Sequence, residues 1–413
     1  MSLKIKIEDL EKVDSEISVV LKVKMLDKIR SEITSRGSLR KFSIELGFSP
    51  SFIPNLLNGW IKSTRLKFFR KISEKLNLKI EDFIECIIAK NSPKSFIPVG
   101  AFPINESTDL ASLVGHAFAD GNVSKLHFSF TNKSEKLISD VIKKVRSLSI
   151  HNVVFSKSFH KAMNIEFSKL VRDILLVAGA PEGRKVNQKL KIPEWIKKGS
   201  SEIKKSFLQA LLNDEATVQL NSKEIVLGMK KSLFIINDLE NFFKEVKILF
   251  NELGVNGITI TDGNIFVTKS GEITKEKRLR ICGVINFIKL KNKVGFIHPN
   301  KEEKLNKLII QIRKNLLKMH QSKIKIVEIL KKEGKLSTIG LSKRIGKTRR
   351  ITGDHLRELE KINVVDRIRV QDKTKPHIWF LDKPENFKIL KFIHLSIPSP
   401  ATQESIEQLM RKL

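Results

Sequence analysis

Two stretches of this 413-residue sequence, LASLVGHAFADGNV (110–123) and SFLQALLNDEATV (206–218), share one pattern. Each is typical of an apolar helix with small residues along one side, and each carries an acid near its C-terminal end, Asp120 and Glu215. Because small residues let two helices approach closely, the two stretches are expected to pack together. An acid there faces the negative end of the helix dipole, at a cost of about 0.3–1 kcal/mol. Because such an acid occurs in both stretches, a functional use of the two carboxylates is favoured over the alternative that both are merely solvated helix ends.

A repeated order of elements surrounds these stretches. In each repeat a β-rich run, a long helix, two more β-rich runs and a final helix follow, which predicts α-β-β-α-β-β-α twice. The β-rich runs after the first helix of each repeat are KLHFSFTN (125–132) and VQLNSKEIVLGM (218–229). We expect an α+β domain over 106–318, divided into repeats of about 106–200 and 201–318. If the two motif helices lie parallel, their carboxylates converge at one end and can share divalent cations.

The N-terminal residues 1–92 have apolar residues at helical spacing and are expected to form an all-α domain. Within them, GSLRKFSIELGFSPSFIPNLLNGW (37–60) resembles a helix-turn-helix, whose second helix, about Pro50 to Leu57, would enter the major groove. Pro54 is unusual in a recognition helix, so a plain helical hairpin is the alternative. A Pro-bearing linker over 93–105 is expected to follow. The candidate contacts to bases and phosphates are Ser49, Ser51, Asn55, Lys62 and Arg65.

Residues 319–385 are expected to form three helices and a β-hairpin, an order that resembles a winged helix. The run KRIGKTRR (343–350) falls at the turn and at the start of the third helix, where a recognition helix presents its N-terminal end to DNA. In that position the run favours DNA contact over a merely solvated charged surface. Residues 386–413 form a tail without an informative pattern. The candidate contacts here are Lys343, Arg344, Lys347, Arg349 and Arg350.

The composition is strongly basic, with 77 Lys plus Arg against 45 Asp plus Glu and a net charge of +32. A thermophilic bias would raise Glu together with Lys, so this excess indicates a polyanionic partner, nucleic acid before an acidic membrane. The sequence has no apolar run of membrane-spanning length and no apolar signal core. Its two cysteines, Cys86 and Cys282, stand apart, which excludes a disulfide framework and fits a reducing cytoplasm.

Together the two motifs resemble those of the LAGLIDADG homing endonucleases, of the single-chain, two-repeat kind. The flanks add to the resemblance. The segment 175–218 matches the Gly-x-Pro-x-Gly, Ile-Pro-x-Trp-Ile and Phe-Leu-x-x-Leu phrases before the family's second motif, and 277–305 matches its closing segment with Val-Gly-Phe. The resemblance covers about half of the chain, and it is specific because the order and spacing agree over some 200 residues.

This resemblance implies a pseudo-twofold saddle whose sheets lie along the major groove of double-stranded DNA. It places Asp120 and Glu215 at the paired metal-binding acids, where Mg²⁺ or another divalent cation would activate water and stabilise the leaving oxygen. The family also places a lysine near the metals, for which Lys133, Lys189 and Lys230 are the candidates. Candidate groove or phosphate contacts on the strands are Lys125, His127, Lys223 and Lys230.

The sequence also departs from the family pattern. Phe118 stands at the variable first-acid position, and Ala210 and Ala216 replace the glycines usual in the second motif. Because Ala216 lacks the easy left-handed geometry of a glycine cap, the reach of Glu215 could differ. No nucleophilic Cys or Ser stands at the start and the chain ends in LMRKL rather than His-Asn, which predicts a free-standing protein rather than an intein.

Three functions are consistent with these features. The first is site-specific cleavage of double-stranded DNA by a monomer, typical of intron-encoded or other mobile elements. The second is a non-cleaving transcriptional regulator, by analogy with bacterial sporulation regulators that join a LAGLIDADG fold to a helix-turn-helix. The third is a maturase that binds RNA, which the two expected helix-turn-helix modules make a minor alternative.

Overall fold

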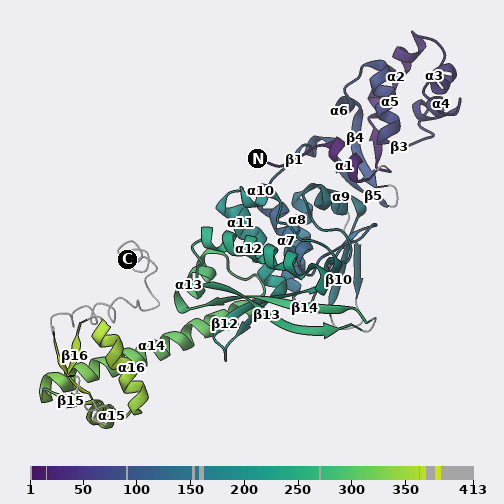
Figure 1. The fold of residues 1–413 in the computed structure, drawn as a ribbon. Coiled ribbons are helices and arrows are strands. Elements are labelled where there is room, and N and C mark those ends of the chain that lie inside the picture. Colours follow the sequence, from purple (N-terminus) through teal and green to yellow (C-terminus); the bar gives the residue numbers. More distant parts are fainter. Residues whose placement is uncertain are drawn as a thin grey trace. The chain divides into compact units, whose positions relative to one another are not determined.

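A computed structural model describes residues 2–14, 16–89, 92–150, 154–157, 162–268, 271–361, 363–368 and 377–382, without the side chains of 92–94, 154–157 and 313–320. The chain forms two compact units, Met1–Leu308 and Ile309–Leu413, which divide within the long helix α14 (Pro299–Glu333). Helices and antiparallel sheets make up both units, so the α+β class is confirmed (Figure 1). None of the described helices combines the length and the apolar character that a membrane crossing requires.

The N-terminal part of the first unit is not all-helical, which corrects the expectation for residues 1–92. The strands β2, β3, β4 and β5 form an antiparallel sheet in the order β3-β2-β4-β5. Strand β2 went unrecognised because its apolar residues run directly into the helical periodicity of the next helix. The elements are β1 (Lys4–Ile5), α1 (Ile7–Val13), β2 (Ser18–Leu21), α2 (Val23–Thr34), α3 (Leu39–Glu45), α4 (Phe52–Leu57), β3 (Thr64–Arg65), α5 (Leu66–Leu76), α6 (Ile80–Phe83), β4 (Ile84–Ala89) and β5 (Ser92–Pro98).

The expected linker over 93–105 is also corrected, because most of it is paired. Strand β5 forms the edge of the sheet beside β4, and an edge strand tolerates proline because its outer side needs no ladder hydrogen bonds. A short 3₁₀ turn (Val99–Ala101) leads to β6 (Ile104–Asn105), which pairs with β1. The ion pair between Lys169 Nζ and Asp14 Oδ2, at 2.7 Å, further joins this part to the rest of the first unit.

Two similar sets of elements follow, each running helix, two strands, helix, two strands, helix. Each set has one antiparallel sheet, in the orders β7-β8-β10-β9 and β11-β12-β14-β13. The first set is α7 (Thr108–Phe118), β7 (Asn122–Val123), β8 (Phe128–Asn132), α8 (Glu135–Ser147), β9 (Val154–Lys157), β10 (Met163–Phe167) and α9 (Lys169–Val177). The second is α11 (Ser201–Glu215), β11 (Ala216–Gln219), β12 (Glu224–Ser232), α12 (Ile236–Glu252), β13 (Ile258–Val267), β14 (Ile273–Cys282) and α13 (Val284–Lys293). The 3₁₀ turn η2 (Lys185–Asn187), α10 (Glu194–Lys197) and the 3₁₀ turn η3 (Leu233–Ile235) complete the unit.

The core of this region lies between the sheets and the helices that cover one face of each. On the second sheet, Leu279 and Ile281 of β14 are buried. Successive strand residues alternate between faces, so Arg278 and Arg280, which are partly exposed, point to the opposite face. Each sheet therefore has one apolar face against helices and one polar face away from them.

The two motif helices, α7 and α11, pack directly against each other, and Gly115 marks their closest approach. A Cβ atom at Gly115 would lie 2.6 Å from the carbonyl oxygen of Phe207 and 2.8 Å from the Cβ of Ala210. The first of these contacts is with backbone, which cannot move aside without shifting the helix. The small residues of the two motifs therefore bring the helix axes together, and Ala210 is accommodated because its partner is glycine.

We expect Gly115→Ala to lower the free energy of unfolding of the first unit by about 1–3 kcal/mol, the usual cost of overpacking. In an unobstructed helix the same change would stabilise the protein by about 1 kcal/mol. A loss of stability instead of a gain would therefore indicate the close approach of the two helices. Gly100→Ala is the matched control, because a Cβ there meets no atom within 4 Å. Urea unfolding of both variants tests the prediction, which is wrong if Gly115→Ala is as stable as the control.

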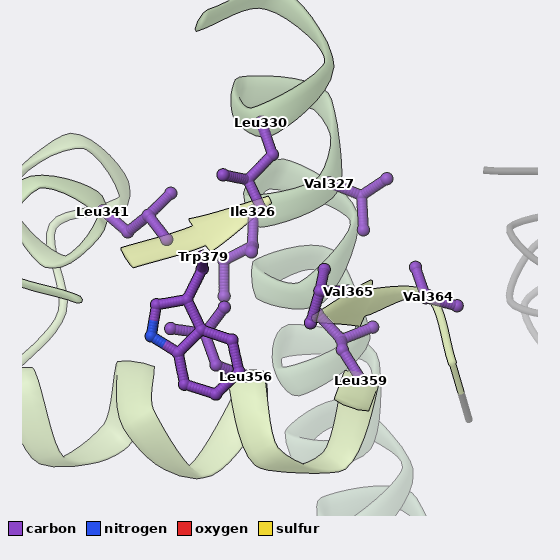
Figure 2. Close-up of a cluster of buried hydrophobic side chains, with 9 residues drawn as sticks. All are labelled: Ile326, Val327, Leu330, Leu341, Leu356, Leu359, Val364, Val365 and Trp379. Atoms are coloured by element: carbon purple, nitrogen blue, oxygen red, sulfur yellow. The ribbon is translucent and has the colours of Figure 1, made fainter. Parts of the chain in front are cut away.

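The second unit contains the end of α14, two shorter helices and a three-stranded sheet in the order β15-β17-β16. Figure 2 shows its core, in which Trp379 lies among apolar side chains from the helices and strands. The turn of the expected β-hairpin and the tail 386–413 lie outside the described residues. The elements are β15 (Leu336–Ser337), α15 (Thr338–Ile345), α16 (Arg349–Lys361), β16 (Val365–Ile368) and β17 (Ile378–Leu381).

Candidate active site at the paired helix ends

The C-terminal ends of α7 and α11 carry the two acids that the motifs singled out. After α7, the N–H of Gly121 donates to the carbonyl oxygen of His116 at 2.8 Å, so Asp120 lies within a tight turn. A Cβ at Gly121 would lie 2.7 Å from that same oxygen and from a ring carbon of Phe128, which explains the glycine. Glu215 is the last residue of α11.

The alanine that follows Glu215 does not disturb this arrangement. Ala216 has φ −84° and ψ 144°, an extended conformation, and its N–H donates to the carbonyl oxygen of Leu212. The chain passes straight from α11 into β11, so no left-handed residue is needed at this position. Ala216 therefore needs no glycine-like conformation at the end of α11.

The two acids lie in surroundings that disfavour their charge. Burial is the main cause that raises the pKa of Glu215 to about 7, and the carboxylate of Asp120 raises it further. Burial also raises the pKa of Asp120, with the charge of Asp214 as the next cause, although Asp120 keeps an exposed surface. The effect of one charge on the pKa of another group weakens with distance, so Asp120, Asp214 and Glu215 belong to one electrostatic cluster. The combined negative charge of this cluster favours the binding of a cation.

Two lysines, which the sequence reasoning missed, oppose this negative charge. Lys185 Nζ donates to the carbonyl oxygen of Gly121 at 2.8 Å, and Lys301 Nζ donates to the carbonyl oxygens of Asn213 and Asp214. The ammonium group of Lys301 thus caps the end of α11, whereas that of Lys185 contacts the turn that follows α7. Burial lowers the pKa of both lysines, whereas the neighbouring acids act in the opposite direction.

Buried polar contacts hold these lysines in place. Lys231 of β12 is 1% exposed, and its ammonium group donates to the carbonyl oxygens of Lys185 and Gln188, which secures the turn that carries Lys185. Burial and the charge of Lys185 lower the pKa of Lys231 to about 8. On the other side, Asn213 Oδ1 accepts from the N–H groups of Ile297 and His298, shortly before Lys301.

A buried polar pair lies directly behind the acids. His116 Nδ1 of α7 is 2.8 Å from Asp214 Oδ2 of α11, and both side chains are fully buried. Among the described residues, His116 Nε2 and Asp214 Oδ1 have no hydrogen-bond partner. This contact joins the two motif helices at the turn that leads to Asp120 and at the residue before Glu215, so it bears on the placement of both acids.

The donor set fits a hard divalent cation that keeps several of its waters. Mg²⁺ is usually held by one or two carboxylates together with substrate phosphates rather than by a complete protein cage. Asp120 and Glu215 supply two such carboxylates, in a cluster whose charges repel. Within the described ranges, no three His, Cys, Asp or Glu side chains gather in a way that could hold a metal ion without further ligands. The remaining positions would belong to water and phosphate oxygens.

The three lysines expected near the metals lie elsewhere. Lys189 is 77% exposed and lies 4.0 Å from Asp238 Oδ1. Lys230 Nζ lies 3.6 Å from the ring centroid of Phe266, and Lys133 is an exposed residue between β8 and α8. The structure favours Lys185 and Lys301 instead. The sequence carries one indication of these two lysines, because each follows the closing helix of its own repeat.

The expected nucleic-acid contacts of the two sheets are accessible. Lys125 and Lys223 are exposed in the turns β7–β8 and β11–β12, and His127 is half-buried. The polar face of the second sheet adds Arg278 and Arg280, which sequence reasoning missed. Arg280 forms a two-pronged contact with Glu224 at 2.6 and 2.7 Å, so its guanidinium is held in a defined orientation.

The expected contacts outside the sheets are also at the surface. Ser49, Ser51 and Lys62 are exposed around α4, whereas Asn55 and Arg65 are half-buried. Arg65 pairs with Glu16 at 2.7 Å, which makes it a structural cation as much as a phosphate contact. In the second unit, Arg344 pairs with Glu333 at 2.6 Å. The exposed cations of that unit's α15–α16 turn are Lys343, Arg344, Lys347, Arg349 and Arg350.

We expect Glu215 to make the stability of the first unit depend on pH in buffer free of divalent cations. The folded pKa of about 7 lies above the ordinary value of 4.5, so the unfolded chain loses this proton first. The free energy of unfolding therefore falls as the pH rises from about 4.5 through about 7. Glu215→Gln removes this contribution. Urea unfolding of the wild type and of this variant at pH 4.5 and 7.5 tests the prediction. The prediction fails if the free energies of unfolding of the two proteins differ by the same amount at both pH values.

No family model matches the chain. It is 25% identical over 246 residues to the DNA-directed RNA polymerase subunit Rpo1N of Methanocaldococcus jannaschii, covering 53% of this chain and 18% of that protein. It is 26% identical over 267 residues to the replication factor C small subunit of the same organism, covering 60% of this chain and 13% of that protein. It is 25% identical over 210 residues to the tRNA-splicing ligase RtcB of Methanopyrus kandleri, covering 45% and 20%. The chain thus spans at most a fifth of these relatives.

Two kinds of solved structure resemble parts of the chain. One is a variant of I-DmoI in complex with its target DNA in the presence of 2 mM Mg, at a TM-score of 0.30 and 16% identity, covering 45% of this chain and 95% of that one. The other is full-length DUF199/WhiA from Thermatoga maritima, at a TM-score of 0.30 and 14% identity, covering 62% and 90%. Both overlaps are partial.

Proposed function

We propose that this protein binds double-stranded DNA at specific sites and cleaves its phosphodiester bonds with a divalent cation, as a LAGLIDADG-type endonuclease. The proposal is supported by the position of Asp120 and Glu215 beside the C-terminal ends of two helices that are in contact through His116 and Asp214, with one lysine near each end. In a chain of net charge +32, acids held together against their mutual repulsion need a reason other than solubility. Recruitment of a cation to a bound phosphate supplies that reason.

The residues of the cluster have separate roles in this proposal. Asp120 and Glu215 would hold the cation, which supplies Lewis-acid activation of water and of the phosphate. Lys185 and Lys301 approach from the two helix ends, where their N–H groups can donate to phosphate oxygens and offset developing negative charge. The buried pair of His116 and Asp214 keeps the two helix ends in register.

Recognition is assigned to three surfaces. The polar face of the second sheet carries Arg278, and the turns between strands carry Lys125 and Lys223; these cations would follow the grooves. The helix-turn-helix around α4 and the winged-helix arrangement of the second unit would add contacts to the phosphates and bases of a longer site. Electrostatic binding of this kind falls steeply with salt, by about 0.9 in log affinity per log salt for each neutralised phosphate.

The curated relatives support a mobile origin. Their names describe three different activities, yet each matches this chain over a comparable length and over a fifth or less of its own. We take the matched part to be a transferable module rather than part of any of those activities. This distribution fits the intron-encoded or mobile-element setting of the endonuclease proposal.

A second candidate is a DNA-binding regulator that does not cleave. It is favoured by the two ammonium groups of Lys185 and Lys301, which already offset the charge of the acids without a metal. The basic surfaces at both ends of the chain would serve such a regulator equally well. Under this alternative Asp120 and Glu215 would be dispensable for activity.

One experiment separates the two candidates. Duplexes that bind the protein are selected from a random pool without divalent cations, and the bound duplexes are then given Mg²⁺. We expect both strands to be cut at a fixed position, with no cutting in the presence of a chelator. Tight and selective binding without cutting, in Mg²⁺ or Mn²⁺, would instead support the regulator. Absence of duplex binding even at low salt would overturn both.

A further inference from the structure

Trp60 is an exposed aromatic side chain that the fold does not use. It is 79% exposed, whereas the other two tryptophans of the chain, Trp195 and Trp379, are 6% and 2% exposed. The Nε1 groups of Trp195 and Trp379 donate to Ala178 and Thr338, as buried indoles usually do. Trp60 therefore presents a large apolar surface to solvent.

The backbone that carries Trp60 is well defined. Helix α4 ends at Leu57, and Gly59 takes φ +76°, the left-handed geometry of a helix stop. The N–H of Gly59 then donates to Leu56 at 3.2 Å and the N–H of Trp60 to Asn55 at 3.0 Å, both at carbonyl oxygens. In this type of helix stop, an apolar residue at the position of Trp60 commonly packs back on the last helical turn. Trp60 does not, so its ring is positioned by the backbone and left free.

The surrounding sequence is cationic. Residues 46–73 contain no acid but five cations, Lys62, Arg65, Lys67, Arg70 and Lys71. Glu16 and Glu11 pair with three of these cations, Arg65, Lys67 and Arg70. Lys62, two residues after Trp60, is exposed, and no carboxylate of the described residues is recorded beside it. A partner that accepts an aromatic ring next to unpaired positive charge matches duplex DNA, whose deoxyribose carbons and thymine methyl groups offer apolar contacts and whose phosphates are negative.

We propose that Trp60 is a DNA contact of the N-terminal part, with its indole packed against the deoxyribose and base edges of duplex DNA beside α4. The proposal rests on the DNA binding proposed above but not on cleavage. It adds apolar contact area at the end of a helix whose other candidate contacts, Ser49, Ser51 and Asn55, are small polar residues. Lys62 would hold an adjacent phosphate and so fix the position of the ring along the groove.

The direct test uses Trp60 as its own reporter. In the Trp195→Phe/Trp379→Phe variant, Trp60 is the only tryptophan of the chain. Titration with a selected duplex should change its fluorescence and protect it from acrylamide quenching by severalfold. If Trp60 stays as accessible to acrylamide in the saturated complex as in the free protein, the proposal is overturned. Unchanged accessibility to acrylamide is also expected if the ring binds a protein partner instead of DNA.

Affinity measurements keep the test valid if the double Phe variant does not fold. In the otherwise unchanged chain, Trp60→Ala should weaken duplex binding by about tenfold or more, the scale of a well-packed aromatic contact. Trp60→Phe should lose less, because it keeps much of the apolar area. Val23→Ala, which truncates another exposed apolar residue (77%) of the same part, should bind as the wild type does.

These outcomes are distinct from failure of the proposed function. If the wild type binds no duplex, the DNA-binding proposal fails and the role of Trp60 in DNA contact fails with it. If the wild type binds and Trp60→Ala binds equally well, only the present inference is overturned. Protection of Trp60 by single-stranded RNA but not by duplex DNA would also overturn it.

Discussion

Under the proposed function, Asp120→Asn and Glu215→Gln should each reduce DNA cleavage by at least about 10³-fold, because each removes a carboxylate that would hold the divalent cation. Binding of the selected duplex without divalent cations should remain, or become slightly tighter, since a negative charge near the phosphates is lost. Single-turnover cleavage of labelled duplex and anisotropy of the same duplex give the two readouts. The separation between them is what identifies the acids as catalytic rather than structural.

The control for these variants is Asp109→Asn, which changes an acid at the other end of the same helix α7. It should cleave within a fewfold of the wild type. Cleavage by Asp120→Asn at the wild-type rate would exclude the assigned active site, even if the protein is a nuclease. If the wild type binds selectively but cuts in no divalent cation, the regulator becomes the better account and the two variants should bind their site normally.

Removal of His116 should destabilise the first unit by about 3–5 kcal/mol, the usual cost of leaving one member of a buried polar pair without its partner. In His116→Ala the carboxylate of Asp214 would keep its position with no donor in reach, since its Oδ1 already has no partner among the described residues. Urea unfolding followed through Trp195, which is buried in this unit, measures the loss.

A double variant separates the loss of the pair from the loss of packing. Replacing both members in His116→Leu/Asp214→Leu removes the stranded charge, so its stability should lie much nearer to the wild type than that of His116→Ala. His127→Ala, at a half-buried histidine outside the helix pair, should change the stability by less than about 1 kcal/mol. If the three variants lose the same amount, the pair contributes no specific stability.

The helices of the repeats could be recognised in the sequence because each signals itself locally. The apolar period of about 3.6 residues identifies α7, α8, α11 and α12, and the acid after each motif can be read directly. The N-terminal strand β2 could not be recognised, because four residues carry too little pattern and the helical period of α2 begins two residues later. Its partner β4 lies more than sixty residues along the chain, so only the folded sheet shows the pairing.

The two lysines beside the acids, Lys185 and Lys301, were beyond sequence reasoning for a related reason. Lys185 contacts a carbonyl 64 residues away and Lys301 one 87 residues away, whereas nothing in the sequence could choose among the three expected lysines, Lys133, Lys189 and Lys230. In a chain with 77 basic residues, the presence of a lysine near an acid in sequence carries little information. What selects Lys185 and Lys301 is the path of the chain after each repeat, which brings the turn η2 and the start of α14 back to the ends of the motif helices.

The sequence by itself determined the two motif helices, the positions of Asp120 and Glu215 and the cationic character of the whole, since these follow from residue type and short-range periodicity. Only the tertiary structure decided which groups surround the acids. The burial of Glu215, the approach of Lys185 and Lys301, the contact between His116 and Asp214 and the exposure of Trp60 all depend on residues that are distant along the chain. Such contacts are set by how the helices and loops pack, and the local pattern of a sequence does not encode that packing in a readable form.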